Sequence, residues 1–162
     1  VPKERSGRSV GRSAPATRPR PREIRTAMAR RTKRHPQAAV IAMRRGRVCL
    51  ITSSSGKRWL VPKGNLMRGC DLRETAAREA WEEAGLVGRV RRHPLGRYEF
   101  EKLGCRYEVV VFCMTVETAK RDWPEKGRRT RRWLRPERAV QRIAYRPLRE
   151  IVAEATASRQ AA

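Results

Sequence analysis

Three glutamates near the middle of the chain, Glu79, Glu82 and Glu83, have the spacing i, i+3, i+4. On a helix this spacing places the three carboxylates within one arc of about 100°. Like charges on neighbouring turns repel one another, at a cost of about 0.2–0.5 kcal/mol per pair. A divalent cation removes that repulsion, and Mg²⁺ takes oxygen ligands while keeping waters for substrate phosphates. Taken alone, such a triplet is usually a solvated acidic face, here balanced by Arg73 and Arg78, and a metal site for phosphate chemistry is the functional alternative that the neighbouring sequence must support.

The segment that must position these carboxylates predicts a helix from residue 71 to residue 85. Asp71 followed three residues later by Glu74 resembles a capping box. The residues after Asp71 are nearly all good helix formers, and Gly85 stands where a left-handed C-cap is expected. The arc beside the glutamates is expected to face the core and consists of Ala77, Ala80, Trp81 and Ala84.

The helix and the loop before it contain a longer pattern of fixed spacing, made of Gly64, Arg78-Glu79, Glu82-Glu83 and Gly85-Leu86. This pattern resembles the signature of the Nudix hydrolases, which is Gly, five residues, Glu, seven residues, Arg-Glu, an aliphatic residue, any residue, Glu-Glu, any residue, Gly and an aliphatic residue. All the spacings match. Two positions depart from the signature, because Cys70 replaces its first Glu and Ala80 is smaller than the usual aliphatic residue.

The resemblance implies an α/β fold, namely a Nudix-like α/β/α sandwich with a mixed central sheet and a catalytic loop-helix motif. It implies a metal-dependent pyrophosphohydrolase with Mg²⁺ as cofactor and Mn²⁺ as an alternative. Carried onto this sequence, it makes Glu79, Glu83 and the Gly64 carbonyl metal ligands. Glu82 becomes a ligand or the general base that orients the attacking water, and Arg78 becomes the residue that fixes the carboxylate rotamers.

The substrate class follows from a narrower resemblance, to the diphosphoinositol polyphosphate and dinucleoside polyphosphate branch of the family. This likeness rests on the segments around the box, 57–64 and 76–85, and on 131–134. Such ligands are densely anionic, and Lys57, Arg58 and Lys63 stand directly before the box, where they are expected to bind phosphate. A second basic cluster, expected to fold back toward the site, consists of Arg128, Arg129, Arg131 and Arg132. Candidates for a further carboxylate ligand are Glu99, Glu101, Glu117 and Glu125.

The rest of the chain predicts three segments: a disordered basic arm over residues 1–35, a Nudix hydrolase domain over 36–157 and a tail over 158–162. The 162 residues carry a net charge of +24, and the arm is interrupted by prolines without apolar periodicity. Within the domain, a hairpin is expected over 38–51 and strands over 59–61, 98–102, 106–116 and 132–134. Helices are expected from Pro136 and Pro147.

The cysteines and the N-terminal residues favour a cytoplasmic protein without a membrane span. Cys49, Cys70, Cys105 and Cys113 show neither C-x-x-C pairing nor zinc spacing, so free thiols are expected. Because Mg²⁺ does not favour thiolate, Cys70 is expected to be a packed or loop cysteine rather than a ligand. An organelle transit peptide is the minority interpretation of the Arg- and Ser-rich N-terminus.

Two hypotheses from different classes remain at this point. The first is a Mg²⁺-dependent hydrolase of a polyanionic small molecule, with oxidised nucleotides or nucleotide sugars as other substrates. The second is a Nudix-fold RNA-binding module with weak or no catalysis, which uses the basic arm for non-specific contact with nucleic acid. The retention of the three glutamates and Arg78 at this spacing favours the enzyme.

Overall fold

The structure is a computed structural model and describes residues 34–160. The strands in this range are β1 (Arg34–Arg44), β2 (Arg47–Thr52), β3 (Trp59–Leu60), β4 (Lys63–Asn65), β5 (Leu86–Val90), β6 (Gly96–Lys102), β7 (Cys105–Ala119) and β8 (Arg131–Leu134). The helices are α2 (Leu72–Ala84), α3 (Pro136–Arg142) and α4 (Arg146–Gln160). The predicted basic arm lies outside the described residues except for its last two positions, which belong to β1.

The strands of this range form one mixed sheet around the long strands β1 and β7. Its main path has the order β3-β2-β1-β7-β5, while β4 pairs with β1, β6 with β7 and β8 with β2. The pair β1–β7 is parallel, with Ala39 opposite Val111, and the other pairs are antiparallel. Alternate residues of β1 and β7 point to opposite faces, and both faces are apolar, so both must be covered.

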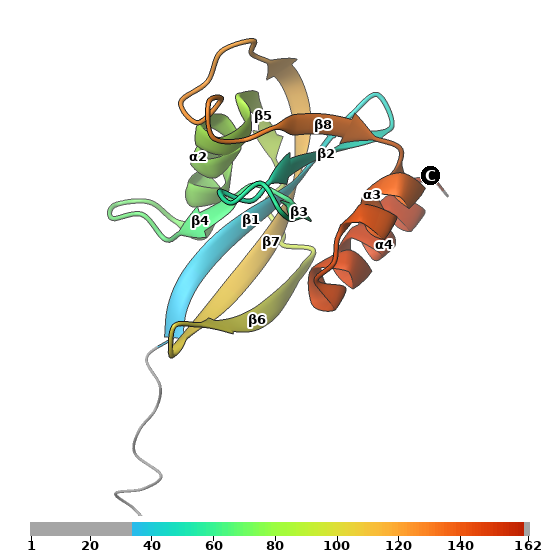
Figure 1. Ribbon diagram of the computed structural model, residues 1–162. Helices are drawn as coiled ribbons and strands as arrows, with labels where there is room; N and C mark the ends of the chain where they lie inside the picture. The colour runs from blue at the N-terminus through green and yellow to red at the C-terminus, as the bar shows by residue number, and fades with distance from the viewer. Residues whose placement is uncertain (1–33, 161–162) are drawn as a thin grey trace, which may run out of the picture. The chain divides into compact units, whose positions relative to one another are not determined.

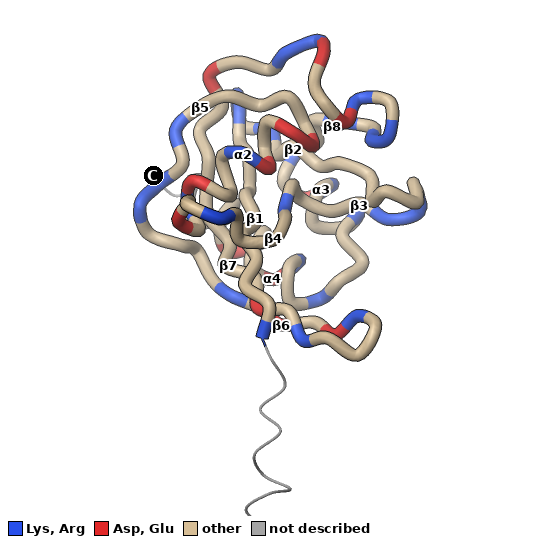
Figure 2. The backbone as a smooth tube through the Cα atoms, turned by 90° about the vertical axis from the view of Figure 1, so that its left-hand side faces the viewer, with Lys and Arg blue, Asp and Glu red and all other residues tan. Residues whose placement is uncertain are grey.

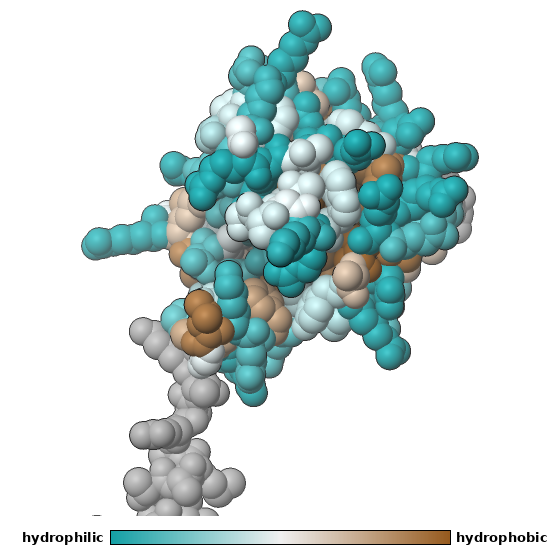
Figure 3. All heavy atoms as spheres, viewed as in Figure 1, coloured by the Kyte–Doolittle hydropathy of each residue, from teal (hydrophilic) through white to brown (hydrophobic). Residues whose placement is uncertain are grey.

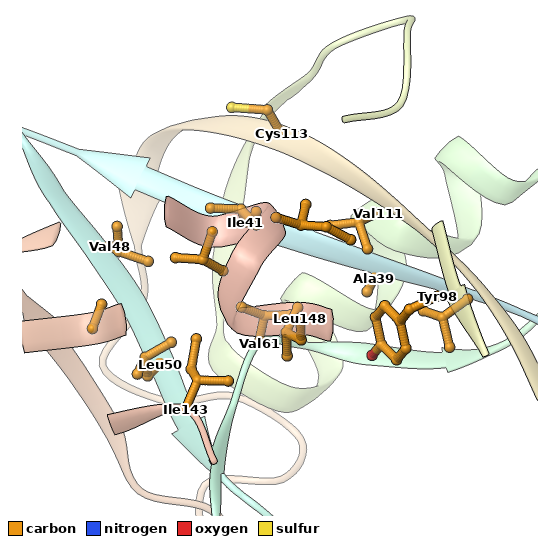
Figure 4. Packing of buried hydrophobic residues seen from close by; sticks show 14 of the residues in the cluster. Ala39, Ile41, Val48, Leu50, Val61, Tyr98, Val111, Cys113, Ile143 and Leu148 are labelled. Atoms are coloured by element: carbon orange, nitrogen blue, oxygen red, sulfur yellow. The ribbon is translucent and has the colours of Figure 1, made fainter. Parts of the chain in front are cut away.

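Helices cover the two faces of the sheet, α2 on one side and α3 with α4 on the other (Figure 1). Ala76, Ala80 and Ala84 of α2 pack against even-numbered residues of β1 and β7 such as Val40 and Phe112. The other core joins odd-numbered strand residues such as Ile41 and Val111 to the C-terminal helices, and Figure 4 shows Leu148 beside Val61 and Ile143 beside Leu50. The predicted α/β/α sandwich with a mixed sheet is confirmed.

The helix that carries the glutamates has the predicted caps. The Asp71 carboxylate accepts from the Glu74 N–H at 2.7 Å, and the Glu74 carboxylate accepts from the Asp71 N–H at 2.8 Å. At the other end Gly85 has φ 64° and donates its N–H back to Trp81 O. The capping box and the left-handed C-cap therefore fix where the helix begins and ends.

The predicted core-facing arc of α2 is wrong at one position, since the Trp81 side chain is 37% exposed. The buried side of the helix instead includes Thr75, Ala76 and Glu83. Glu83 belongs to the buried side because its carboxylate accepts from the Lys63 main-chain N–H and pairs with Arg129, whereas Trp81 lies outside the buried stripe.

Other boundaries differ from the expected ones by small amounts. The predicted strand 59–61 is shorter, and the turn after it contains the unpredicted strand β4, whose Gly64 pairs with Ala38. Strand β5 was not expected either, and it pairs with the end of β7 through a register shift at Val87 and Gly88. Helix α4 continues to Gln160, and Ser158 Oγ donates to Glu154 O at 3.0 Å within the segment expected as a tail.

The surface of the described range is strongly polar. Basic segments are spread over the whole backbone, while α2 carries acidic ones (Figure 2). Hydrophilic side chains also dominate the face seen in Figure 3. All four cysteines are free, as expected, with Cys49 and Cys113 buried. None of the helices in residues 34–160 is long and apolar enough to cross a bilayer.

Candidate metal and phosphate site

Glu79 lies directly against the backbone of Gly64 at the edge of the sheet. A Cβ atom added to Gly64 would overlap the Glu79 carboxylate. Strand β4 holds Gly64 in place by pairing with β1, and α2 packs on the same strand pair. Gly64 thus provides the space in which the Glu79 carboxylate lies against the main chain.

Glu83 is the most buried acidic residue of the site, with 4% of its surface exposed. Its Oε2 accepts from the Lys63 main-chain N–H at 2.9 Å, and its Oε1 pairs with the Arg129 guanidinium. Arg129 also donates to Glu125 and, at 3.0 Å, to the Thr52 carbonyl. Arg129 therefore neutralises a buried carboxylate and links α2 to the loop before β8.

The electrostatic state of the two inner glutamates suits a cation site. Burial raises the pKa of Glu79 to about 7, with Glu83, Glu82 and Glu125 adding to the rise and Arg129 opposing it. Burial also raises the pKa of Glu83 to about 7, while the Lys63 N–H and Arg129 oppose the rise. Carboxylates with such raised pKa values gain from any nearby positive charge, because it favours their ionised form.

Glu82 lies at the outer side of this cluster. Its carboxylate accepts from Arg78 Nε at 2.9 Å, an i, i+4 pair on the exposed side of α2. Arg78 was expected to fix the rotamers of all three carboxylates. In the structure Arg78 pairs with Glu82, whereas Arg129 takes the corresponding position beside Glu83.

Of the four candidates for a further carboxylate, the structure brings Glu125 to the site. Glu125 pairs with Arg129 and acts electrostatically on both Glu79 and Glu83. The other three candidates pair elsewhere: Glu99 with Arg34 and Arg106, Glu101 with Arg106, and Glu117 with Arg89. The sequence alone offered no way to choose among the four, since the choice depends on how the loop of residues 120–130 folds.

That loop is fastened to the end of α2. The Trp123 side chain packs on Gly85, where an added Cβ would meet Trp123 Cβ at 2.9 Å. Arg131 stacks its guanidinium 4.4 Å from the Trp123 ring centroid and donates to the carbonyls of Ala84 and Lys120. The Glu125 N–H also donates to Glu82 O at 3.0 Å. These contacts place Glu125 and Arg129 beside the carboxylates of Glu79 and Glu83.

Of the three residues predicted to bind phosphate, only Lys63 contacts the carboxylate site in the described part of the chain. Lys63 reaches the site through its main chain, and its ammonium donates to Gln37 Oε1 at 3.1 Å. Lys57 and Arg58 lie exposed in the turn before β3. In the second basic cluster Arg129 joins the carboxylates, Arg131 fastens the loop, and Arg128 and Arg132 are exposed. Their roles toward a substrate stay predictions.

The donors of this site fit a hard divalent cation in kind, since they are carboxylates and a main-chain carbonyl. Within residues 34–160 no group of three His, Cys, Asp or Glu side chains is already gathered around one point. Two arginines explain this, because Arg78 holds Glu82 outward and Arg129 occupies one oxygen of Glu83. A cation that binds Glu79 and Glu83 would take over the charge that Arg129 now neutralises.

A hollow of the described range lies elsewhere. It has a volume of about 600 Å³ and is lined by Met43, Arg44, Arg45 and Gly46 together with residues of β7 and α4. Met43 is four residues further along β1 than Ala39, the partner of Lys63, which corresponds to about 13 Å of strand. The carboxylate cluster is therefore separate from this hollow.

Replacing Gly64 with Ala is expected to abolish most of the metal-dependent hydrolysis that the sequence resemblance implies, while leaving the fold intact. The new methyl group would displace the Glu79 carboxylate, which is the flexible end of its side chain, so the backbone need not move. We expect kcat/KM to fall about tenfold to a hundredfold, as for groups that orient metal ligands, and the melting temperature to change little. Gly127→Ala is the matched control, because an added Cβ there meets no atom within 4 Å. Equal activity of the two variants would contradict the placement of Glu79.

Comparisons with known proteins identify the family of the chain. Residues 33–155 match the NUDIX domain family. The chain is 36% identical over 115 residues to "Nudix hydrolase 16, mitochondrial" of Arabidopsis thaliana, covering 66% of this chain and 63% of that protein. It is 34% identical over 101 residues to the mouse "Diphosphoinositol polyphosphate phosphohydrolase 3-alpha", covering 60% of each. The chain thus spans about three fifths of the length of these relatives.

Among solved structures, an Ap4A hydrolase from C. elegans, described as a binary complex, superposes with a TM-score of 0.63. The two chains share 18% sequence identity, and the likeness covers 79% of this chain and 99% of the other. At that identity the superposition shows the fold alone. The resemblance inferred from the spacing of Gly64, Glu79, Glu82 and Glu83 is confirmed by the match to the family, and the chain belongs to the NUDIX domain family.

Proposed function

We propose that this chain is a divalent-cation-dependent hydrolase of a phosphoanhydride bond in a densely phosphorylated small molecule. The observation that carries the proposal is the pair Glu79 and Glu83, held beside the Gly64 and Lys63 main chain with pKa values raised to about 7. A stable fold does not need two adjacent carboxylates with poor solvation, whereas a cation site does. The names of the relatives as hydrolases support the same reaction class.

The parts of the site have distinct roles in this proposal. Glu79, Glu83 and the Gly64 carbonyl hold the cation, which is Mg²⁺ or Mn²⁺ and supplies neutralisation of the phosphoryl charge. Glu82 is a further ligand or the general base for the attacking water, and Arg78 orients Glu82 through their 2.9 Å hydrogen bond. Lys57, Arg58 and Lys63 attract and orient the phosphate chain.

The substrate is proposed from the branch of the family that the chain resembles. The mouse relative is named for diphosphoinositol polyphosphates, and the worm structure is named for a dinucleoside polyphosphate. Both classes of ligand are polyanions, which suits a chain with a net charge of +24. The cytoplasmic location stays a prediction, and the mitochondrial label in the plant relative's name belongs to that protein.

A substrate panel with and without Mg²⁺ tests the proposal. The purified chain is expected to release phosphate or nucleotide from a dinucleoside tetraphosphate or a diphosphoinositol polyphosphate, and EDTA is expected to stop the release. An oxidised nucleoside triphosphate and a nucleotide sugar complete the panel. No turnover of any member, together with tight RNA binding that weakens steeply with salt, would replace the hydrolase with the RNA-binding alternative.

A further inference from the structure

Three aromatic side chains form a continuous row across β1, β7 and β6. His35 lies opposite Tyr107 in the parallel pair β1–β7, and Phe100 lies opposite Tyr107 in the antiparallel pair β6–β7. Residues directly opposite in neighbouring strands share a face and contact one another. The His35 and Tyr107 rings have centroids 5.3 Å apart, while Tyr107 and Phe100 stack at 4.9 Å with planes 10° apart. We call His35, Tyr107 and Phe100 the aromatic row; all three are partly exposed.

The aromatic row has a polar edge made by Lys63, Gln37 and Asn65. The Lys63 ammonium lies 4.9 Å from the Phe100 ring centroid, which is a cation–π distance. The same ammonium donates to Gln37 Oε1, and Gln37 Nε2 donates to Asn65 Oδ1 at 2.8 Å. Gln37 follows His35 by two residues in β1 and so lies on the same face of the sheet. Flat apolar surface and fixed amide groups therefore lie side by side.

The acidic residues of β6 and β7 nearest to the aromatic row lie on the other face of the sheet. Glu99 and Glu101 alternate with Phe100 along β6, and Glu108 follows Tyr107 in β7, so their side chains leave from the opposite face. These carboxylates pair with arginines such as Arg34 and Arg106. An anionic ligand on the aromatic row would therefore meet Lys63 rather than a carboxylate on its own side of the strands.

Lys63 joins the aromatic row to the carboxylate site. Its side chain covers Phe100, its main-chain N–H donates to Glu83, and the next residue, Gly64, adjoins Glu79. Strand β4 pairs only with β1 among the strands of residues 34–160, so it is an edge that a ligand can pass. The aromatic row lies on the face of the sheet opposite α2, so a molecule whose phosphates reach Glu79 and Glu83 has to bend around the edge strand β4, past Lys63, to place another group on the aromatic row.

The two candidate substrate classes differ in the chemical group that would lie on the aromatic row. A nucleobase has a π face and edge groups that hydrogen-bond, so it gains from stacking on aromatic rings beside amides. An inositol ring has no π face, and its phosphate substituents surround it with charge that stacked rings do not solvate. We propose that the aromatic row binds the base of a nucleoside polyphosphate substrate. This rests on the proposed function and favours dinucleoside over diphosphoinositol polyphosphates.

Kinetics on ligands with and without a base test the proposal. Phe100→Leu and Tyr107→Leu keep apolar volume but remove the π face. Each is expected to raise KM for diadenosine tetraphosphate about tenfold with kcat little changed, in keeping with the effect of removing one stacking ring. KM for inorganic tripolyphosphate, which has no base, is expected to stay within about twofold. The control is Val87→Ala, an exposed apolar residue of β5 outside the aromatic row. An equal change in KM for both ligands, or no change for either, would overturn the aromatic row as a base site.

A binding measurement separates this proposal from the hydrolase assignment. ADP, added to the full chain without divalent cations, is expected to shift the NMR signals of the Phe100 and Tyr107 rings, whereas pyrophosphate, which reaches only Lys63 beside Phe100, is expected to leave the Tyr107 signals unchanged. If the wild-type chain hydrolyses nothing but ADP still perturbs these rings, the base site stands and the hydrolase fails. If it hydrolyses tripolyphosphate or diphosphoinositol polyphosphate but ADP leaves the rings unchanged, the hydrolase stands and the base site is wrong.

Discussion

Replacing Glu79 with Gln is expected to lower kcat/KM about a hundredfold or more while leaving the protein at least as stable at pH 8. The loss of a group that only orients a metal ligand lowers metal affinity or activity about tenfold to a hundredfold. The loss of a ligand itself should lower kcat/KM by at least as much. Gln keeps the shape of the side chain against Gly64 but removes its charge. The measurement is kcat/KM on the best substrate of the panel, with Mg²⁺ titrated in parallel by calorimetry to follow the loss of affinity.

The stability of Glu79→Gln follows from the sign of the pKa shift. Burial and the neighbouring glutamates raise the pKa of Glu79 to about 7, above its ordinary value of 4.5. Such a carboxyl stabilises the fold below pH 4.5 and loses that contribution as the pH rises through about 7. Without divalent cations, the variant should therefore match the wild type in melting temperature at pH 5 and exceed it at pH 8. The control is Glu117→Gln, which removes an exposed carboxylate paired with Arg89. It should change neither kcat/KM nor the melting temperature. Full activity in Glu79→Gln would contradict the site.

Most of the fold could be predicted because its signals are local. Asp71, Glu74 and Gly85 mark the two ends of α2 through hydrogen bonds within four residues of each other, and the structure has those bonds. The hairpin β6–β7 is likewise set by the turn at Leu103 and Gly104. Strands β4 and β5 escaped prediction because they are short. Their pairing with β1 and β7 depends on contacts far along the chain.

The site was predictable only as far as the spacing on one helix defines it. That spacing places Glu79, Glu82 and Glu83 on neighbouring turns, but it does not say which of them is buried. Burial of Glu83 depends on the Lys63 main chain from one side and Arg129 from the other, 46 residues further along. A basic cluster around Arg129 was visible in the sequence, whereas its pairing with a carboxylate follows from the Trp123 packing that fastens the loop.

Arg129→Ala is expected to destabilise the protein by about 3–5 kcal/mol at pH 8, as for other broken buried ion pairs. For a chain of this size that corresponds to a fall in melting temperature of roughly 10 °C. The side chains of Arg129 and Glu83 are 12% and 6% exposed, so water does not replace the lost guanidinium. Because Arg129 holds down the pKa of Glu83, which is already about 7, its loss raises that pKa further. A protonated Glu83 needs no cation, so the deficit should shrink as the pH falls to 5.5 and widen as it rises to 8.

A divalent cation should compensate in part for the missing guanidinium, because it supplies positive charge to the same carboxylate. We therefore expect Mg²⁺ to raise the melting temperature of Arg129→Ala more than that of the wild type at pH 8. Calorimetry should show tighter Mg²⁺ binding per site, since Arg129 no longer competes for Glu83. Arg128→Ala removes a neighbouring exposed arginine and should show none of these effects. A deficit in Arg129→Ala that changes with neither pH nor Mg²⁺ would mean that Arg129 acts only through its bonds to Thr52 and Glu125, and that cation and guanidinium do not share Glu83.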